Sequence, residues 1–466
     1  MIAVIGSGFA GCAAAIALAR AGHRIALYEA ARVPGGRART VLRDGLPLDN
    51  GEHLLLGACT ETLALAAFVH GPSPHPPWRD APLAMQPLAP RRQSAPTLRA
   101  RALPAPLGLA AGLVTARGFT LRERIAAARW FARQRRTGFR CDDSMTVAEL
   151  VVDLPARVRD ELWMPLCVAA LNTAPARASA QVFLNVLRES LGASAHATRI
   201  VHARNGLGAL LPEPAVRWLA SQDHRVHLST RARVALRAEG IRITYAGGET
   251  VADAAIVAVG PHQLDAAFDP QLAAAPGVAA ALRAVAAFEW EPIVTVYLGY
   301  GGAFAVPPRL TRLDDNPGQW LFDRGDILAR ATRSIPSGIG TLLSVVMSAR
   351  GAHAELPHAA LIAAVDAQLR RLARSVPPLA WSQVIAERRA TYACAPALAR
   401  PACGRIAERV YLAGDYTYAG FPATLEAAVR SGTAAARALL ADLPVPATTP
   451  RASAAGAAAR DSIRAP

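Results

Sequence analysis

The chain has 466 residues, which allows two or three domain-sized cores, and its 52% hydrophobic content excludes a disordered protein. The formal net charge is +16, and all 51 basic residues are arginine. The six cysteines are scattered without a C-x-x-C pair, so the sequence shows neither a disulfide framework nor a metal site. This cysteine usage is typical of a reducing cytosol.

The positive charge is concentrated between Arg91 and Arg140, where twelve arginines are accompanied by one acidic residue, Glu123. Such a stretch favours contact with anionic lipid headgroups, and a solvated basic helix face is the simpler alternative. Aromatic residues are not interleaved with these arginines as stacking on single strands requires, so nucleic acid is not an expected partner.

The uncharged run from Met1 to Ala19 could be mistaken for a signal peptide or a membrane span. A basic segment does not precede it, and its three glycines would weaken a membrane helix. No other run reaches the roughly 18 apolar residues that span a bilayer. We expect a soluble cytoplasmic protein that docks peripherally on the inner face of the membrane.

The N-terminus carries a nucleotide-binding pattern. The β-branched run Ile2–Ile5 is suited to a buried strand, and G-S-G-F-A-G follows it. A helix is predicted from Cys12 to Ala21, and a second strand from Arg24 to Tyr28 ends at Glu29. This is the strand, G-x-G-x-x-G, helix, strand and acid order of a dinucleotide-binding unit, in which Glu29 accepts hydrogen bonds from a ribose.

Each glycine of this motif has a separate task. Gly6 permits the tight turn, Gly8 lets the backbone approach a pyrophosphate, and Gly11 lets helix and strand pack closely. Phe9 and Ala10 lie where the helix begins, and the unpaired N–H groups of a helix start point toward the pyrophosphate. The motif alone does not decide between NAD and FAD.

The following residues favour FAD. Gly35-Gly36-Arg37 comes six residues after Glu29 and resembles the second fingerprint of the flavin amine oxidase and phytoene desaturase superfamily. In that superfamily the glycine at Gly36 brings the backbone to the cofactor, and the arginine at Arg37 meets the pyrophosphate, which suits a guanidinium geometrically.

Strand patterns return after a long interruption, at 226–228, 234–236, 241–245 and 255–259, with a hairpin turn at Gly247-Gly248. They predict a small meander followed by a buried strand. In the superfamily this is where the chain re-enters the FAD domain, and the segment around Val234 would hold the adenine through backbone contacts.

The C-terminal part contains a further buried strand that starts at Arg409 and ends in Gly414-Asp415, before a helix from about Thr424 to Leu440. By resemblance, Asp415 meets the ribityl–phosphate part of FAD. The start of the helix, at Thr424 and Leu425, points at the flavin pyrimidine edge, where the positive helix end stabilises reduced flavin. The small residues of this helix predict close packing; they are Ala427, Ser431 and Ala435.

The remaining segments read as inserts. The Pro-rich stretch from Pro72 to Pro106 predicts irregular loops, and the helical patterns after it predict a mostly helical region; these patterns are 121–134, 163–171 and 182–191. A second insert shows strand runs at 293–299 and 342–347 and a helical pattern at 359–374.

The predicted fold class is α/β, with a Rossmann-like FAD-binding domain that combines a parallel sheet and a small β-meander, plus an inserted α+β substrate domain. We expect a discontinuous FAD-binding domain from residues 1–75, 196–264 and 405–443. The substrate- or membrane-facing inserts are expected at 76–195 and 265–404, and a disordered tail at 444–466.

Two stretches, GGRARTVLRDGLPLDNGEHLLLGACTETL and RVYLAGDYTYAGFPATLEAAVRSG, resemble the squalene-associated FAD-dependent desaturases, the hydroxysqualene dehydroxylases of bacterial squalene and hopanoid synthesis. The resemblance covers about 60 N-terminal and 35 C-terminal residues. One position departs from the pattern, since glutamine is usual where this chain has Glu52.

The resemblance implies reductive dehydroxylation of hydroxysqualene, a thirty-carbon isoprenoid alcohol, to squalene, with functional coupling to squalene-synthase-like enzymes. Hydroxide leaves poorly, so the chemistry needs a proton donor near the C–O bond, and an apolar tunnel must hold the chain. A carotenoid desaturase or isomerase, another flavin oxidase of the amine or protoporphyrinogen type, and a non-catalytic flavoprotein are the alternatives.

The segment Asp49-Asn50-Gly51 is read as a turn, and Gly51 would allow close approach to the flavin. The two residues after it, Glu52 and His53, are the candidate catalytic pair, and a purely structural, hydrogen-bonding role is the alternative. Leu54–Leu56 read as a buried strand or cavity wall.

Overall fold

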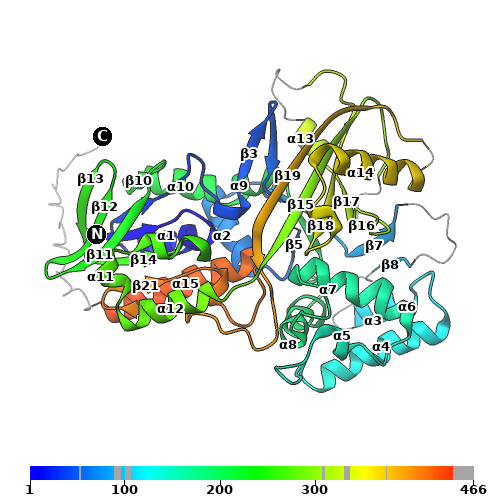
Figure 1. The fold of residues 1–466 in the computed structure, drawn as a ribbon, viewed down its shortest axis with the longest axis horizontal. Coiled ribbons are helices and arrows are strands. Elements are labelled where there is room, and N and C mark those ends of the chain that lie inside the picture. Colours follow the sequence, from blue (N-terminus) through cyan, green and yellow to red (C-terminus); the bar gives the residue numbers. More distant parts are fainter. Residues whose placement is uncertain are drawn as a thin grey trace, which may run out of the picture.

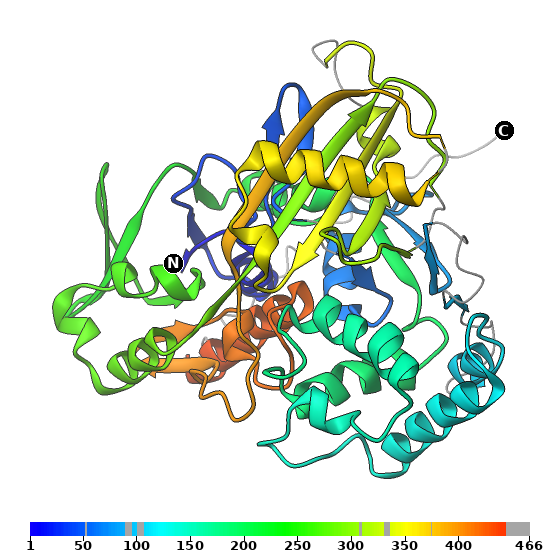
Figure 2. The same ribbon diagram turned by 45° about the vertical axis from the view of Figure 1, so that its right-hand side comes forward.

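The computed structural model describes residues 1–51, 54–88, 96–99, 107–306, 310–329, 336–373 and 375–443, and it forms two halves that lie side by side (Figures 1 and 2). The first half is built on a six-stranded sheet in the order β10-β2-β1-β14-β21-β20, in which only β20 is antiparallel to its neighbour. Its strands are β1 (Ile2–Ile5), β2 (Ile25–Tyr28), β10 (Arg225–His227), β14 (Ala254–Val257), β20 (Gly404–Ala407) and β21 (Val410–Leu412).

Both faces of this sheet are covered, which explains why β1 and β2 read as continuous apolar runs. Ile2 and Val4 pack on one side against two helices, whereas Ala3 and Ile5 pack on the other side against the meander. The covering elements are α1 (Phe9–Arg20), α15 (Leu425–Asp442), β11 (Ala232–Arg237), β12 (Gly240–Tyr245), β13 (Gly248–Ala252), α11 (Pro270–Ala273) and α12 (Pro276–Ala286).

The second half is built on a seven-stranded sheet in the order β19-β15-β18-β17-β16-β7-β8. Helix α14 packs on one face, and the helical region that starts at α3 packs on the other (Figure 2). The strands are β7 (Ala84–Pro87), β8 (Leu98–Arg99), β15 (Trp290–Tyr300), β16 (Leu310–Arg312), β17 (Trp320–Asp323), β18 (Thr341–Ser348) and β19 (Leu379–Tyr392). The helices are α3 (Leu107–Val114), α4 (Leu121–Arg136), α5 (Val147–Leu150), α6 (Ala156–Val158), α7 (Met164–Leu171), α8 (Ala180–Leu187) and α14 (His358–Leu372).

Short elements connect the halves. The hairpin of β3 and β4 ends at Asp49, whose carboxylate accepts from the Thr40 hydroxyl at 2.7 Å and from the Leu207 N–H at 2.9 Å. Arg324 of the second half lies 3.6 Å from the same carboxylate. The connecting elements are β3 (Thr40–Arg43), β4 (Leu46–Asp49), β5 (Leu55–Leu56), β6 (Trp78–Ala81), β9 (Ile200–Ala203), α2 (Thr60–His70), α9 (Gly206–Leu210), α10 (Pro212–Ser221) and α13 (Gly325–Leu328).

The expected elements of the first half are confirmed, although the predicted helix 12–21 begins earlier, at Phe9. The main omission concerns the second sheet. The sequence predicted strands only at 293–299 and 342–347. The 14-residue strand β19 was missed because most of its residues are exposed or half-buried; only Val384, Thr391 and Tyr392 are buried. The Pro-rich stretch expected to form irregular loops contributes β7 and β8 to the same sheet.

Among the described residues, none of the helices combines the length and the apolarity that a membrane crossing requires. The tail expected at 444–466 lies outside the described residues.

Candidate cofactor site

A cavity of about 450 Å³ opens at the carboxyl ends of four neighbouring parallel strands. Gly6 follows β1, Glu29 follows β2, Ala258 follows β14, and Gly414 comes two residues after β21. Open α/β sheets bind their ligands at this edge, where the chain leaves adjacent strands in different directions. We call it the cofactor cavity; eleven predicted residues line it: Gly6, Gly8, Phe9, Ala10, Glu29, Gly36, Arg37, Gly414, Asp415, Thr424 and Leu425.

The glycines of the two fingerprints make room for a ligand. Gly6 has a positive φ of 102°, and a Cβ there would lie 2.8 Å from the Ala258 carbonyl oxygen. A Cβ on Gly36 would lie 3.4 Å from the Cα of Gly8, so side chains at these positions would fill the space between the two backbones. Gly11 has the packing role expected for it, because a Cβ would lie 1.8 Å from the Gly6 carbonyl oxygen.

Helix α1 begins at the cofactor cavity, and no capping side chain occupies the N–H groups of its first turn. Its N-cap residue, Gly8, makes no side-chain capping bond, and its first turn contains no acidic residue. Phe9 and Ala10 at this helix start line the cavity. An uncapped helix start with positive potential suits a pyrophosphate, and this is the role that the motif predicts for it.

Glu29 is 9% exposed and is held rigidly at the cavity wall. Ser7 donates its backbone N–H and its hydroxyl to Oε2 of Glu29, each at 2.8 Å, and the Ala31 N–H donates to Oε1 at 2.8 Å. A carboxylate has about four lone-pair sites, so an acceptor site remains on Oε1 for a ribose hydroxyl. The side chain therefore fits the predicted role.

Arg37 and Asp415 form an ion pair inside the cavity. The guanidinium also donates from Nη1 to the Ala390 carbonyl oxygen at 2.9 Å. Burial alone would lower the pKa of Arg37, but the Asp415 carboxylate outweighs it and raises this pKa. Arginine has five N–H donors, and these contacts use two, which leaves donors for a phosphate.

Some cavity residues were missed by the sequence analysis. His262, Glu387, Ala390 and Thr391 line the cavity from segments that carry no recognisable motif, and the last three belong to β19. Burial lowers the pKa of His262, and the charge of Arg37 lowers it further. Its imidazole is thus a neutral group near neutral pH. Because the sequence analysis did not predict β19, it gave no reason to single out the three cavity residues on this strand.

The cofactor cavity does not include three of the predicted residues, which are Gly11, with the packing role described above, Val234 and Gly51. Val234 is fully buried, and its carbonyl oxygen accepts the Asp269 N–H at 2.9 Å; Ala232, two residues earlier, lines the cavity instead. Gly51 also lies off the cavity wall, with a φ of 92° that completes the expected turn by donating its N–H to the Asp49 carbonyl oxygen at 2.9 Å.

The asparagine of this turn connects it to the cofactor cavity. Asn50 donates to the Arg37 carbonyl oxygen at 3.0 Å and to the Glu387 carboxylate at 3.1 Å. The turn is therefore fixed beside two cavity residues. The candidate catalytic pair, Glu52 and His53, lies outside the described residues.

Helix α15 begins at the cofactor cavity, with the Thr424 hydroxyl accepting the Ala427 N–H at 3.2 Å. The expected small face is fully buried at Ala427, Ser431 and Ala435. The closest approach, however, is at Gly432, where a Cβ would lie 2.1 Å from the Ala10 carbonyl oxygen. This glycine packs α15 against α1 at the cavity.

A Rossmann-type sheet, two glycine cradles and an Arg–Asp pair at one cavity define a dinucleotide-binding flavoprotein with a second, inserted domain. The chain belongs to the flavin containing amine oxidoreductase family, whose sequence profile matches residues 9–440. FAD is its cofactor, and the protein is an FAD-dependent oxidoreductase.

Two curated relatives are similar over nearly their whole length. The chain is 32% identical to hydroxysqualene dehydroxylase of Rhodopseudomonas palustris over 94% of this chain and 98% of the relative. It is 29% identical to hydroxysqualene dehydroxylase of Sinorhizobium fredii over 93% of this chain and 96% of the relative. The resemblance found in the sequence is confirmed.

The fold is also that of solved oxidoreductases. An oxidoreductase from Methanosarcina mazei has a TM-score of 0.72, with 13% identity over 93% of this chain and 99% of that one. The expected fold class, a Rossmann-like domain with an inserted α+β domain, is confirmed.

We predict that Glu29→Ala weakens FAD binding about tenfold, because it removes a charged acceptor and releases the Ser7 loop. The dissociation constant is measured by titrating the apoprotein with FAD and following flavin fluorescence. Glu239→Ala removes an exposed carboxylate from the same half and serves as the control. An unchanged dissociation constant in Glu29→Ala would contradict the ribose role.

Proposed function

We propose that the protein catalyses FAD-dependent reductive dehydroxylation of hydroxysqualene to squalene. The observation that carries the proposal is that the two relatives named above match this chain from end to end, including both cofactor segments and the inserts between them. The residues that line the cofactor cavity are also proposed as the FAD contacts, in the roles given above.

Bound in its reduced form, FAD would supply the hydride that replaces the hydroxyl group. The side chains of the protein have to supply the proton. Hydroxide is a poor leaving group, so a side chain must protonate the departing oxygen. Glu52 and His53 are proposed as the candidates, because they follow the Asn50 turn that is fixed against Arg37 and Glu387 of the cofactor cavity.

The residues that follow Glu52 and His53 in the sequence are apolar and pack against a hydrophobic core. Leu54 and Leu56 pack against the core shared by the helical region and the second sheet, as does Ile293 at the start of β15. This core contains stacked aromatic side chains such as Trp163 and Phe131. A hydrocarbon chain needs such apolar surroundings, and this supports an isoprenoid substrate beside this core of the second half.

The test is the conversion itself. Purified FAD-loaded protein with chemically reduced flavin is expected to convert hydroxysqualene to squalene, detected by gas chromatography, since the reaction needs only substrate, hydride and proton. Phytoene serves as the comparison substrate and is incubated with oxidised FAD and an added electron acceptor, because desaturation takes a hydride and a proton from carbon. Turnover of phytoene without turnover of hydroxysqualene would instead establish a carotenoid desaturase or isomerase.

The residue that protonates the hydroxyl is tested with Glu52→Gln, which restores the amide usual in the resembling family. If Glu52 is the acid, kcat falls by about 10²-fold or more, because general acid catalysis contributes 10²–10⁴-fold. His53→Gln is the matched variant of the neighbouring residue. Full activity in Glu52→Gln with loss in His53→Gln would assign the proton to His53 instead.

We further propose that α3 and α4 dock the protein on an anionic membrane. Val114, Leu121 and Ile125 are 44%, 60% and 36% exposed and lie together where α3 ends and α4 begins. Exposed arginines continue along the outer side of α4, at positions 122, 129 and 133. Exposed apolar residues beside a cationic helix face fit the surface of an anionic bilayer.

This surface covers only the described part of the arginine-rich stretch expected from Arg91 to Arg140, because residues 91–95 and 100–106 lie outside the described residues. A membrane location suits a water-insoluble substrate. It would also bring the protein close to squalene-synthase-like enzymes that act on the same class of isoprenoid, which we include in the proposal.

Replacing Arg122, Arg129 and Arg133 by glutamine is predicted to lower binding to vesicles that contain anionic lipid by about 100-fold, since each charge near such a surface contributes about 1 kcal/mol. Cosedimentation measures the bound fraction. The control replaces three exposed arginines elsewhere, Arg371, Arg405 and Arg409, and thus removes the same charge. Equal loss in both triple variants would exclude a specific docking face.

A further inference from the structure

A buried asparagine joins the helical region to the strand that lines the cofactor cavity. Asn172 is the C-cap residue of α7, is 5% exposed, and has a positive φ of 47°. Its backbone N–H donates to the Val168 carbonyl oxygen at 2.9 Å, which closes the last turn of the helix. Asparagine tolerates this left-handed backbone better than most residues, and here it places an amide side chain at the helix end.

The hydrogen bonds of the Asn172 side chain fix the direction of its amide. Oδ1 accepts the Ala349 N–H at 2.6 Å. Nδ2 donates to Oγ1 of Thr391 at 2.9 Å and lies 3.3 and 3.4 Å from the carbonyl oxygens of Pro292 and Glu291. A backbone N–H only donates and a carbonyl oxygen only accepts, so the reversed amide would place donor against donor and acceptor against acceptor.

This direction of the amide determines how the Thr391 hydroxyl is used. Its Oγ1 accepts from Asn172, so the proton of the hydroxyl remains to be donated to another group. Within the part of the chain that the structure describes, no group accepts this proton. Thr391 is 6% exposed, and buried polar groups in folded proteins have hydrogen-bond partners. The partner that Thr391 lacks is therefore an acceptor.

Thr391 lines the cofactor cavity, next to charged residues that are proposed to contact FAD. The residue before it, Ala390, accepts from the Arg37 guanidinium at 2.9 Å, and Arg37 is paired with Asp415. FAD carries acceptors of several kinds, which are phosphate oxygens, ribityl oxygens, and the nitrogens and oxygens of the flavin ring. A bound FAD would thus supply the acceptor that Thr391 lacks.

We propose that Thr391 donates a hydrogen bond from its hydroxyl to bound FAD, and that Asn172 is the positioning residue that makes Thr391 a donor. Asn172 ends α7, which packs in the core that Leu54 and Leu56 also contact. The bond would therefore connect the packing of the helical region to the cofactor. The proposal rests on the FAD contacts proposed above for the cofactor cavity, and not on the identity of the substrate.

The donor is tested by comparing Thr391→Val with Thr391→Ser. Valine removes the hydroxyl and keeps the β-branched shape that suits a strand, and Asn172 keeps its two carbonyl acceptors, so we expect Thr391→Val to fold. Its dissociation constant for FAD, measured by titrating the full-length apoprotein, is expected to rise about tenfold. Serine keeps the hydroxyl, and Thr391→Ser is expected to bind FAD within about twofold of the parent protein.

Thr295→Val is the matched control. Thr295 lies on the neighbouring strand β15, is fully buried, and is not among the described residues that line the cofactor cavity. It pairs with Ile385, so about 20 Å of strand separates it from Thr391. We expect Thr295→Val to bind FAD as tightly as the parent protein does.

The role of Asn172 is tested with Asn172→Gly, because glycine keeps the left-handed helix end and removes the amide. The Thr391 hydroxyl is then no longer held as a donor, and the dissociation constant for FAD is expected to rise about three- to tenfold. The same change in the Thr391→Val background is expected to add less than about twofold, since the bond is already lost. An equal rise in both backgrounds would contradict the positioning role of Asn172.

The absorption spectrum of FAD-loaded Thr391→Val identifies the acceptor on the cofactor. Weaker FAD binding with shifted flavin bands would assign the bond to the flavin ring, and weaker binding with unchanged bands would assign it to a ribityl or phosphate oxygen. Unchanged FAD affinity in Thr391→Val, or an equal loss of affinity in Thr391→Val and Thr391→Ser, would overturn the proposal.

Discussion

The ion pair between Arg37 and Asp415 is the contact on which the cofactor site depends. It joins residues 378 positions apart in the chain, and the same guanidinium also donates to the Ala390 carbonyl oxygen of β19. One side chain thus holds the second glycine loop, the end of β21 and the last strand of the second sheet around one cavity. A buried charge is tolerated only when its partners are complete, which makes this geometry hard to replace.

Other buried carboxylates follow the same principle. Glu29 fixes the first glycine loop through Ser7, Asp49 fixes the start of α9 through the Leu207 N–H, and Glu426 accepts from the N–H groups of Glu61 and Thr62 at the start of α2. In each case a carboxylate satisfies backbone donors of a loop or of a helix start. Most of their acceptor sites are used by these backbone donors, so we do not expect these carboxylates to be the proton donor of the reaction.

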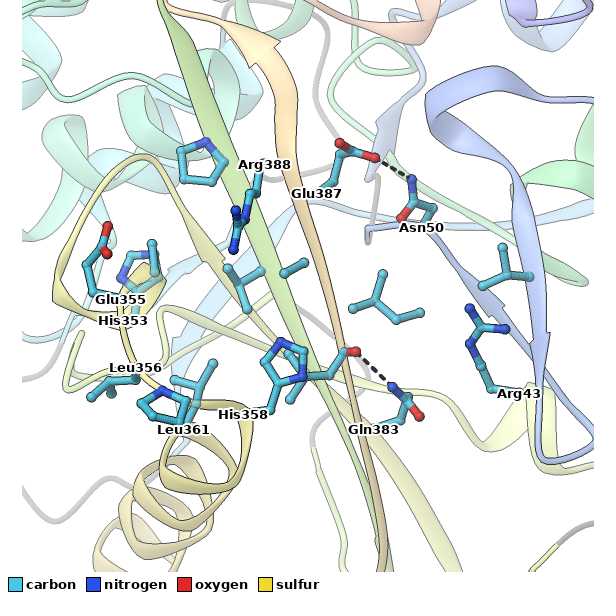
Figure 3. A pocket seen from close by; sticks show the side chains of 18 of the residues that line it. Arg43, Asn50, His353, Glu355, Leu356, His358, Leu361, Gln383, Glu387 and Arg388 are labelled. Atoms are coloured by element: carbon cyan, nitrogen blue, oxygen red, sulfur yellow. Dashed lines mark hydrogen bonds between the residues drawn. The ribbon is translucent and has the colours of Figure 1, made fainter. Parts of the chain in front are cut away.

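Strand β19 connects the chemistry of the two halves. Its last residues line the cofactor cavity, while its middle lines a second cavity beside the start of α14 (Figure 3). The inserted domain therefore contributes residues to the cofactor cavity itself. It supplies polar groups to the cofactor cavity and an apolar face toward the helical region.

The sequence by itself determined the cofactor-binding half, because glycine spacing, short buried strands and the acids at their ends are local patterns with a direct physical cause. Gly6, Gly8 and Glu29 were predicted as cofactor contacts in this way, whereas Gly36 was predicted by resemblance to a family fingerprint. Only the tertiary structure decided that Arg37 meets Asp415, that Ala232 rather than Val234 lines the cofactor cavity, and that β19 contributes residues to this cavity. These features arise from pairing and packing between distant segments. The burial that β19 gains from β15 and from the β3–β4 hairpin is not encoded in its own alternation of apolar and polar residues.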